Sequence, residues 1–102
     1  MKVVWSPAAD RDLGRQYSYL RSRSPDAARR LARRVLAAVE LLAEQPDMGP
    51  VIPGLQPVGV YRRVVVGSHM LVYRHDGHTL FILRFWDARQ DPASFSLGGS
   101  EE

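Results

Sequence analysis

The alternation of apolar and polar residues between Tyr61 and Pro92 predicts three antiparallel strands joined by two tight turns. Asp76-Gly77 lies between two β-rich runs and favours a type I′ turn, in which both central residues need positive φ. A two-residue turn at this position fixes how the second and third strands pair. The predicted pairs are Tyr73 with Leu80, Leu71 with Ile82, His69 with Arg84, and His75 with His78 beside the turn.

Successive side chains of a strand point to opposite faces, so this register gives the sheet an apolar face and a mixed face. The apolar face is predicted to be the core and carries Met70, Val72, Phe81, Leu83 and Phe85. The mixed face is expected to be a working or partner-binding surface. It carries His69, Tyr73, Arg84 and Trp86, and a two-residue turn at Gly67-Ser68 adds Arg62 opposite Tyr73.

Two helix-start signals precede these strands. Ser6-Pro7 and Ser24-Pro25 each combine a capping side chain with a proline that is tolerated at the first helical position. Apolar residues then recur with helical spacing, and the second helix is expected to end near Gln45-Pro46. The residues predicted to face the sheet are Leu13, Tyr17, Leu31, Val35 and Leu42.

The order of the elements predicts the fold class. Residues 2–5 form a short apolar run that predicts a first strand, and residues 46–57 are rich in Pro and Gly, which is typical of a loop. The order β-α-α-β-β-β predicts an α+β fold, with a helix hairpin packed on one face of a small antiparallel sheet. A chain of 102 residues makes one domain, predicted over residues 1–95, with a flexible tail at 96–102.

Composition narrows the function classes. The chain has no cysteine, so disulfides and thiolate metal sites are excluded, which suits a cytoplasmic protein. No apolar run approaches the roughly 20 residues of a membrane span, and the N-terminus has no signal-peptide pattern. The net charge is +3, and most of the cations lie in the first half of the chain. An acidic partner or a nucleic acid is therefore expected to meet that half.

Four arginines of the second helix form two rows with a spacing of four residues. They are Arg29, Arg30, Arg33 and Arg34, and no acid lies between them. One interpretation is a solvated helix face. The alternative is a docking strip for an acidic protein partner or for nucleic-acid phosphates.

Arg84 and His69 are the sharpest candidates for chemistry. Arg84 interrupts an apolar strand, so it is an anchor for a carboxylate or phosphate, an exposed strand residue, or an arginine paired with Asp87 or Asp91. His69 beside an arginine would be neutral and could act as a base, although a half-buried sheet histidine fits the same pattern. Trp86 is expected to be partly exposed.

Metal and cofactor sites are not predicted. His75 and His78 flank a turn, but no third ligand is evident beside them. The chain has no glycine-rich phosphate loop, no H-E-x-x-H motif and no serine elbow. We therefore expect neither a metal nor a cofactor.

Several short motifs occur in an order that resembles one protein family. They are W-S-x-x-A-x-x-D-L at Trp5 to Leu13, Glu44-Gln45-Pro46 at the helix end, G-x-x-x-x-G-V-Y-R-R at Gly54 to Arg63, V-G-x-x-x-L-V-Y-R at Val66 to Arg74, and I-L-R-x-x-x-x-R-x-D-P at Ile82 to Pro92. Together they resemble the RelE/ParE superfamily of toxin–antitoxin toxins, and the ParE-like branch (plasmid stabilisation proteins) in particular. One departure is Asp87, where many relatives have His.

The resemblance implies a toxin that inhibits DNA gyrase by binding, with no catalytic residues, and that is neutralised by a cognate antitoxin. The antitoxin is expected to be acidic, with an N-terminal ribbon-helix-helix domain and a segment that folds on binding. It would dock on the arginines of the second helix. The expected target or partner surface comprises Arg62, His69, Tyr73, Arg84, Trp86 and Arg89.

Two alternatives stay open at this point. The first is a RelE-like endoribonuclease that cuts ribosome-bound mRNA without a metal, using Arg62, His69, Tyr73 and Arg84. The absence of Lys, Arg, Tyr and His from residues 90–102 weakens this alternative, because that family uses such residues near the C-terminus. The second is a binding module without toxicity.

Overall fold

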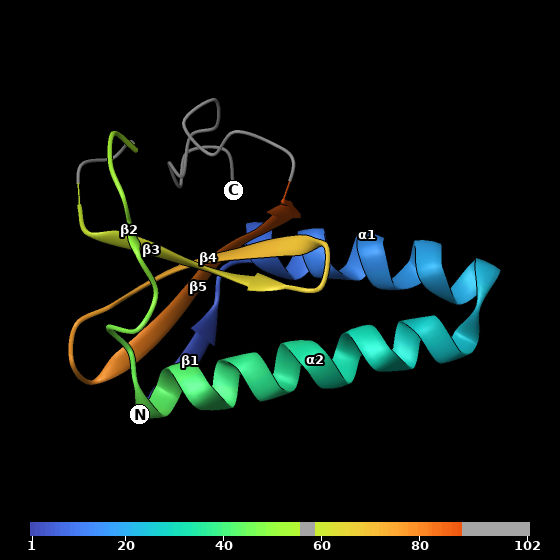
Figure 1. The fold of residues 1–102 in the computed structure, drawn as a ribbon, viewed down its shortest axis with the longest axis horizontal. Helices are drawn as coiled ribbons and strands as arrows, with labels where there is room; N and C mark the ends of the chain where they lie inside the picture. Colours follow the sequence, from blue (N-terminus) through green and yellow to red (C-terminus); the bar gives the residue numbers. More distant parts are fainter. Residues whose placement is uncertain (56–58, 89–102) are drawn as a thin grey trace.

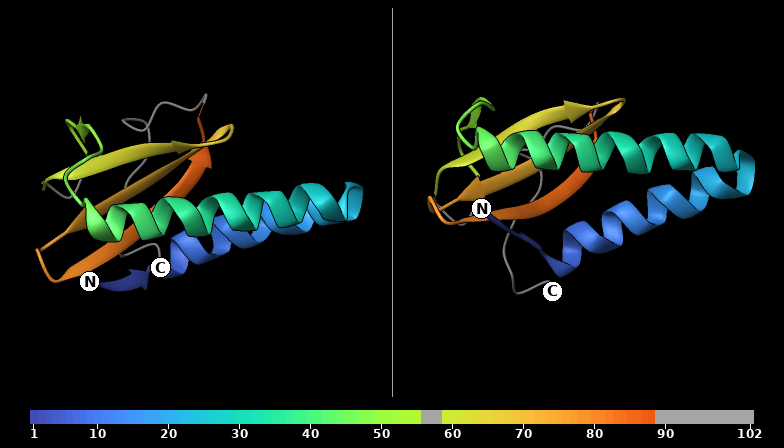
Figure 2. Two further views of the ribbon diagram at one scale, coloured as in Figure 1. Left: turned by 60° about the horizontal axis from the view of Figure 1, so that its bottom comes forward. Right: turned by 90° about the horizontal axis from the view of Figure 1, so that it is seen from below.

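The computed structural model describes residues 1–55 and 59–88, and it has two layers (Figure 1). The helices α1 (Pro7–Arg23) and α2 (Pro25–Glu44) form one layer, and a five-stranded sheet forms the other. Figure 2 shows both helices on the same side of the sheet and projecting together beyond it. The predicted α+β class and the helix hairpin are confirmed. The predicted tail at 96–102 lies outside the described residues.

The helices begin where the serine–proline pairs predict. Ser6 Oγ accepts a hydrogen bond from the Ala9 amide at 3.0 Å, and Ser24 Oγ accepts one from the Ala27 amide at 3.2 Å. Each proline occupies the first turn, where its missing N–H costs nothing. Ser24 also closes α1, because its amide donates to the Leu20 carbonyl. One residue therefore ends the first helix and caps the second, which makes the hairpin connection as short as it is.

The sheet contains β1 (Lys2–Trp5), β2 (Val51–Ile52), β3 (Tyr61–Val66), β4 (His69–His75) and β5 (Thr79–Asp87). Their spatial order is β1-β5-β4-β3-β2. The sheet differs from the prediction in two details. β1 runs parallel to β5, because the two helices carry the chain back before β5 forms, and the two-residue β2 arises within the predicted loop. None of the helices in the described ranges is long and apolar enough to cross a membrane.

The predicted pairing of β3 with β4 is confirmed, with Arg62 opposite Tyr73. The predicted pairing of β4 with β5 is wrong: Tyr73 lies opposite Ile82, Leu71 opposite Phe85, and His69 opposite Asp87. His75 likewise lies opposite Leu80 and not opposite His78.

The turn and a bulge explain this difference. Gly77, with a φ of 90°, is the one residue of this turn that has positive φ. A type I′ turn needs positive φ at both central residues, so this turn is not type I′. Asp76 precedes the tight turn and caps it, since its Oδ1 accepts hydrogen bonds from the amides of His78 and Thr79 at 2.9 and 2.8 Å. A register shift then follows between Val72 and Tyr73, where β5 contributes one extra residue, Leu83.

The predicted core face is also wrong, because the helices cover the other face of the sheet. Leu71, Tyr73, Leu80 and Ile82 are fully buried against the helices. Leu31, Val35 and Leu42 of α2 point into this cluster as predicted, with Leu13 partly buried beside it. Of the five residues predicted for the core face, Phe85 alone joins this cluster, because the bulge moves its side chain to the helix-covered face of the sheet.

The opposite face of the sheet has a core of its own. Met70, Val72 and Trp86 are buried there against Ile52, Leu55 and Tyr61, with Leu83 partly buried beside them. Both faces of β4 are therefore apolar, which explains why alternation along the sequence did not identify the face that the helices cover.

Candidate functional site

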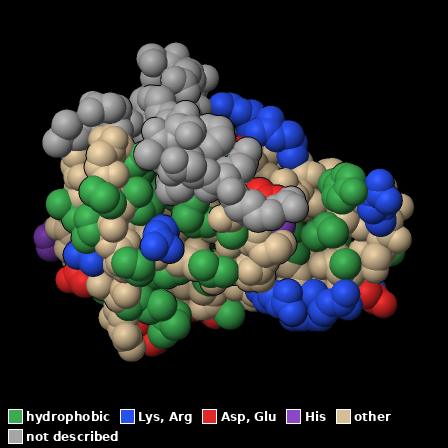
Figure 3. All heavy atoms as spheres, turned by 45° about the horizontal axis from the view of Figure 1, so that its top comes forward, with side chains coloured by type: hydrophobic (Ala, Val, Ile, Leu, Met, Phe, Trp, Pro, Cys, Tyr) green, Lys and Arg blue, Asp and Glu red, His purple; other side chains and the backbone are tan. Residues whose placement is uncertain are grey.

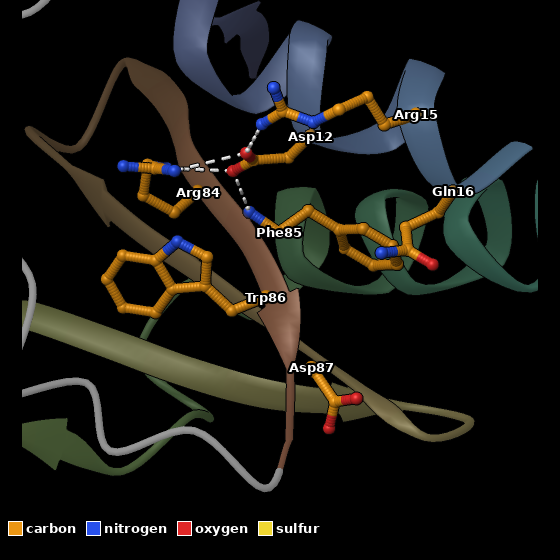
Figure 4. Close-up of a pocket in the computed structure, with 7 residues that line it drawn as sticks. All are labelled: Asp12, Arg15, Gln16, Arg84, Phe85, Trp86 and Asp87. Atoms are coloured by element: carbon orange, nitrogen blue, oxygen red, sulfur yellow. Dashed lines mark hydrogen bonds and ion pairs between the residues drawn. The ribbon is translucent and has the colours of Figure 1, made fainter.

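Asp12 of α1 holds the side chain of Arg84 on β5. Arg84 Nε donates to Asp12 Oδ2 at 2.7 Å, and Arg84 Nη2 donates to Oδ1 at 3.1 Å. The backbone amide of Phe85 donates to the same Oδ2 at 3.0 Å, and Arg15 donates to Oδ1 at 3.1 Å. Asp12 is only 5% exposed and Arg84 19%. This bidentate ion pair joins α1 to β5 (Figure 4).

The prediction that Arg84 faces outward, opposite His69, is wrong. The shifted turn and the bulge at Leu83 together place Arg84 opposite Val72. The Arg84 guanidinium lies over the Trp86 ring, 5.1 Å from the centroid. Trp86 is also buried rather than partly exposed, with 4% of its surface accessible. A cavity of about 290 Å³ opens beside the ion pair, between α1 and the end of β5. In Figure 4, Asp87 lies at the far end of this cavity and points away from Asp12.

Arg62 and Tyr73 lie side by side, as the register of β3 and β4 predicts, and both hold the loop after α2. The Tyr73 hydroxyl donates to the Pro46 carbonyl at 2.7 Å and accepts from the Gly49 amide at 3.1 Å. Burial raises the pKa of Tyr73, so the hydroxyl stays protonated and able to donate. Arg62 donates to the carbonyls of Asp47 and Gly49 at 3.0 and 2.9 Å. Both predicted site residues therefore support the loop.

Gly49 explains why that loop lies so close to the sheet. A Cβ added there would lie 2.5 Å from the Arg63 carbonyl oxygen and 2.8 Å from the Tyr73 hydroxyl oxygen. Asp47 adds a charged contact at the same place, because His75 Nε2 lies 2.6 Å from its Oδ1. That hydrogen bond is the main reason why the pKa of Asp47 is lowered.

His69 lies at the other end of β4, away from this loop. Its ring stacks on Phe85, with the centroids 4.8 Å apart. Burial lowers the pKa of His69 and outweighs the opposing effect of Asp87 across the strand pair. His69 is therefore neutral at neutral pH, as predicted, but the cause is burial and not a neighbouring arginine. The structure thus brings Arg62 and Tyr73 together and leaves His69 and Arg84 in separate surroundings.

The α2 arginines, defined as Arg29, Arg30, Arg33 and Arg34, are all exposed. Arg29 pairs with Asp26 three residues earlier, in the first turn of the helix. The other three have no ion pair within the described part of the chain. Figure 3 shows Lys and Arg side chains gathered over the helical end of the molecule. Arg89, which was also predicted as a surface residue, lies outside the described residues.

Asp12 is the residue that sequence reasoning missed. A signal was present, because Asp12 follows the buried Ala8 by four residues and therefore shares its helix face. A carboxylate on a buried face needs a cation or hydrogen-bond donors nearby. Within residues 1–55 and 59–88, no group of three or more His, Asp or Glu side chains is placed to hold a metal ion.

Solved structures with the same fold include the following two. One is from "Chromosomal ParDE TA system from P. aeruginosa", with a TM-score of 0.69 and 21% identity, covering 87% of this chain and 97% of the other. The other is "YoeB/ParE toxin from Agrobacterium tumefaciens", with a TM-score of 0.54 and 17% identity, covering 85% and 98%. Comparison with curated proteins gives no match.

One family model matches almost the whole chain. It is described as "ParE toxin of type II toxin-antitoxin system, parDE" and covers residues 3–92. The match spans both helices, the first strand and the β3–β5 sheet, which is the region that carries the predicted motifs. The chain therefore belongs to the ParE toxin family of type II toxin–antitoxin systems.

Proposed function

We propose that this ParE-family chain inhibits DNA gyrase by binding to it, and that a cognate antitoxin neutralises it. The observation that carries the proposal is the state of the four residues that RNA cleavage would need. Arg62 and Tyr73 hold a loop, Arg84 is paired with Asp12, and His69 stacks on Phe85. General acid–base catalysis needs such groups to converge on one scissile bond. Their separate structural roles favour action through a binding surface.

The target is tested by expressing the chain without its antitoxin. We expect growth arrest with a DNA-damage response and intact mRNA, and inhibition of supercoiling when the purified protein is added to gyrase. His69→Ala is expected to keep most of this inhibition, as is the matched variant His78→Ala in the exposed turn. Thermal unfolding of both variants separates lost activity from lost folding. Cleaved mRNA that depends on His69 would establish the ribonuclease alternative.

The antitoxin is proposed to be acidic and to dock on the α2 arginines. Attraction between opposite charges speeds association and makes its rate depend on salt. Arg29→Glu with Arg33→Glu is therefore expected to slow association and to flatten its salt dependence. Arg63→Glu with Arg74→Glu, on the sheet, changes the net charge equally and is the control. Equal slowing by both pairs would show that net charge matters and the α2 surface does not.

We propose that the partner for this experiment is a small acidic protein encoded by a reading frame beside this gene. We expect it to carry a ribbon-helix-helix pattern at its N-terminus and a polar, acidic C-terminal segment that orders on binding. Mixing it with the toxin is expected to restore both growth and supercoiling. Tight binding without rescue of supercoiling would contradict neutralisation by this partner.

A further inference from the structure

A second cavity opens between α2 and the β3–β4 turn, and we call it the α2 notch. Its volume is about 200 Å³. The floor is apolar and includes Leu20, Leu31 and Val66, while the polar rim includes Arg30, Arg34 and His69. It is separate from the Asp12–Arg84 ion pair, with which it shares no lining residue. The α2 notch therefore combines two cations with a small apolar surface.

The two arginines of the rim repel each other. Arg30 and Arg34 lie four residues apart, so their side chains project from the same side of α2. Neither has an acidic partner in the described ranges, in contrast to Arg29 with Asp26. An anion placed between the two guanidinium groups would relieve this repulsion and accept hydrogen bonds from both.

The turn keeps the α2 notch open. Gly67 has a φ of 64°, and Arg34 Nη1 lies 3.4 Å from the position that a Cβ on Gly67 would occupy. A larger residue in the turn would therefore crowd the Arg34 guanidinium. His69 and Ser68 line the same side of the cavity and can donate hydrogen bonds. His69 does so without a third positive charge, because burial lowers its pKa.

The apolar floor decides which kind of anion fits. A nucleic-acid backbone carries phosphates without an aliphatic group to cover Leu20, Leu31 and Val66. Bases bind by stacking on aromatic rings, and the one ring of the rim, His69, already stacks on Phe85. An acidic peptide offers both parts, a carboxylate for the arginines and an aliphatic side chain for the floor.

We propose that the α2 notch is the anchor site of the antitoxin, which places a carboxylate between Arg30 and Arg34 and a neighbouring aliphatic side chain on the apolar floor. This inference rests on the proposed antitoxin partner. Of the four α2 arginines, we assign Arg30 and Arg34 as the pair that binds the carboxylate. The inference also sets the chemistry of the partner segment, which is an acidic residue beside Leu, Ile or Val.

The first test uses small probes and the full chain. N-acetyl-leucine carries a carboxylate and an isobutyl group, and N-acetyl-leucinamide lacks only the charge. We expect N-acetyl-leucine to shift the backbone amide NMR signals of Gly67, Ser68 and His69 in a saturable way, with at least about tenfold weaker binding of the amide. Equal binding of the two probes would overturn the carboxylate assignment. Tighter binding of inorganic phosphate or of a thymidine oligonucleotide would assign the notch to nucleic acid instead.

Matched variants locate the site. Arg34→Gln is expected to weaken N-acetyl-leucine binding at least about fivefold, since it removes one of the two cations. Arg33→Gln removes the same charge one position away, outside the notch, and is expected to leave binding unchanged. A loss of the same size in both variants would show a general charge effect and contradict the inference.

The same variants separate this inference from the proposed function. If the antitoxin binds Arg34→Gln as tightly as it binds the unmodified chain, the α2 notch is not its anchor site. The proposed neutralisation would not be affected by that result. If N-acetyl-leucine binds in the α2 notch but no antitoxin binds the chain, the proposed neutralisation is overturned. The α2 notch would then still be a carboxylate site. The expected result is faster dissociation of the antitoxin from Arg34→Gln, whereas Arg33→Gln slows association and leaves the dissociation rate unchanged.

Discussion

Arg84 and the α2 arginines carry the same guanidinium group in opposite surroundings. Arg84 lies between α1 and β5, is largely buried and is held by Asp12 through two hydrogen bonds. Arg30, Arg33 and Arg34 lie at the helical end, exposed and without an ion pair in the described residues. The arginine that interrupts an apolar strand thus belongs to the fold. The α2 arginines, which resemble an ordinary solvated helix face, are the group that we propose binds a partner.

The largest expected effect is a difference in stability between variants of two aspartates that each pair with an arginine. Asp12 and Asp26 each pair with an arginine three residues later in a helix, but their side chains are 5% and 73% exposed. Asp12→Ala is expected to cost about 3–5 kcal/mol, because it leaves buried donors without their carboxylate. Asp26→Ala is expected to cost no more than about 1 kcal/mol, as exposed pairs do. Urea unfolding of both variants measures the difference, and similar losses would contradict it.

The next largest effect concerns the loop that Arg62 and Tyr73 hold. Tyr73→Phe removes a hydroxyl that serves both the Pro46 carbonyl and the buried Gly49 amide. We expect a loss of about 1–3 kcal/mol, the usual cost of a buried group left without its hydrogen bond. Tyr19→Phe is the control, because Tyr19 is 55% exposed. A loss below about 0.5 kcal/mol in Tyr73→Phe would show that the loop is held by other contacts.

The smallest effect is a pH dependence at His69, which borders the α2 notch. Burial lowers the pKa of His69 below its usual 6.5 in the folded protein, so the unfolded chain binds this proton at higher pH. The free energy of unfolding should therefore be unaffected well above 6.5 and fall as the pH drops through 6.5 toward the folded pKa. His69→Gln should flatten this fall and His78→Gln should not. Identical pH profiles for the two variants would contradict the account.

The helices were predictable because their signals are local. Ser6-Pro7 and Ser24-Pro25 specify the starts within three residues of sequence, and the apolar stripe of α2 agrees with its buried residues. The pairing of β3 with β4 was predictable for the same reason, since one short turn at Gly67-Ser68 determines it. The family resemblance, which rests on motifs distributed along the chain, is confirmed by the match over residues 3–92.

The site around Arg84 was not predictable from local signals. The shifted turn moves Arg84 away from His69, and one extra residue in β5 then turns Phe85 to the helix-covered face. Nothing near Leu83 in the sequence marks this bulge. The partner of Arg84 is Asp12, which is 72 residues away, so only the packing of α1 on β5 brings the two together. Because β4 has apolar residues on both faces, alternation along the sequence could not show which face the helices cover.

Unfolding of a series of single arginine variants tests the central contrast most directly. Arg84→Gln, Arg30→Gln, Arg33→Gln and Arg34→Gln each remove one guanidinium and keep a polar side chain of moderate length. We expect Arg84→Gln to lower the free energy of unfolding by about 3 kcal/mol or more, because it breaks a largely buried pair. The three α2 variants should stay within about 0.5 kcal/mol of the unmodified chain. Losses of equal size in all four variants, or a stable Arg84→Gln, would contradict this contrast.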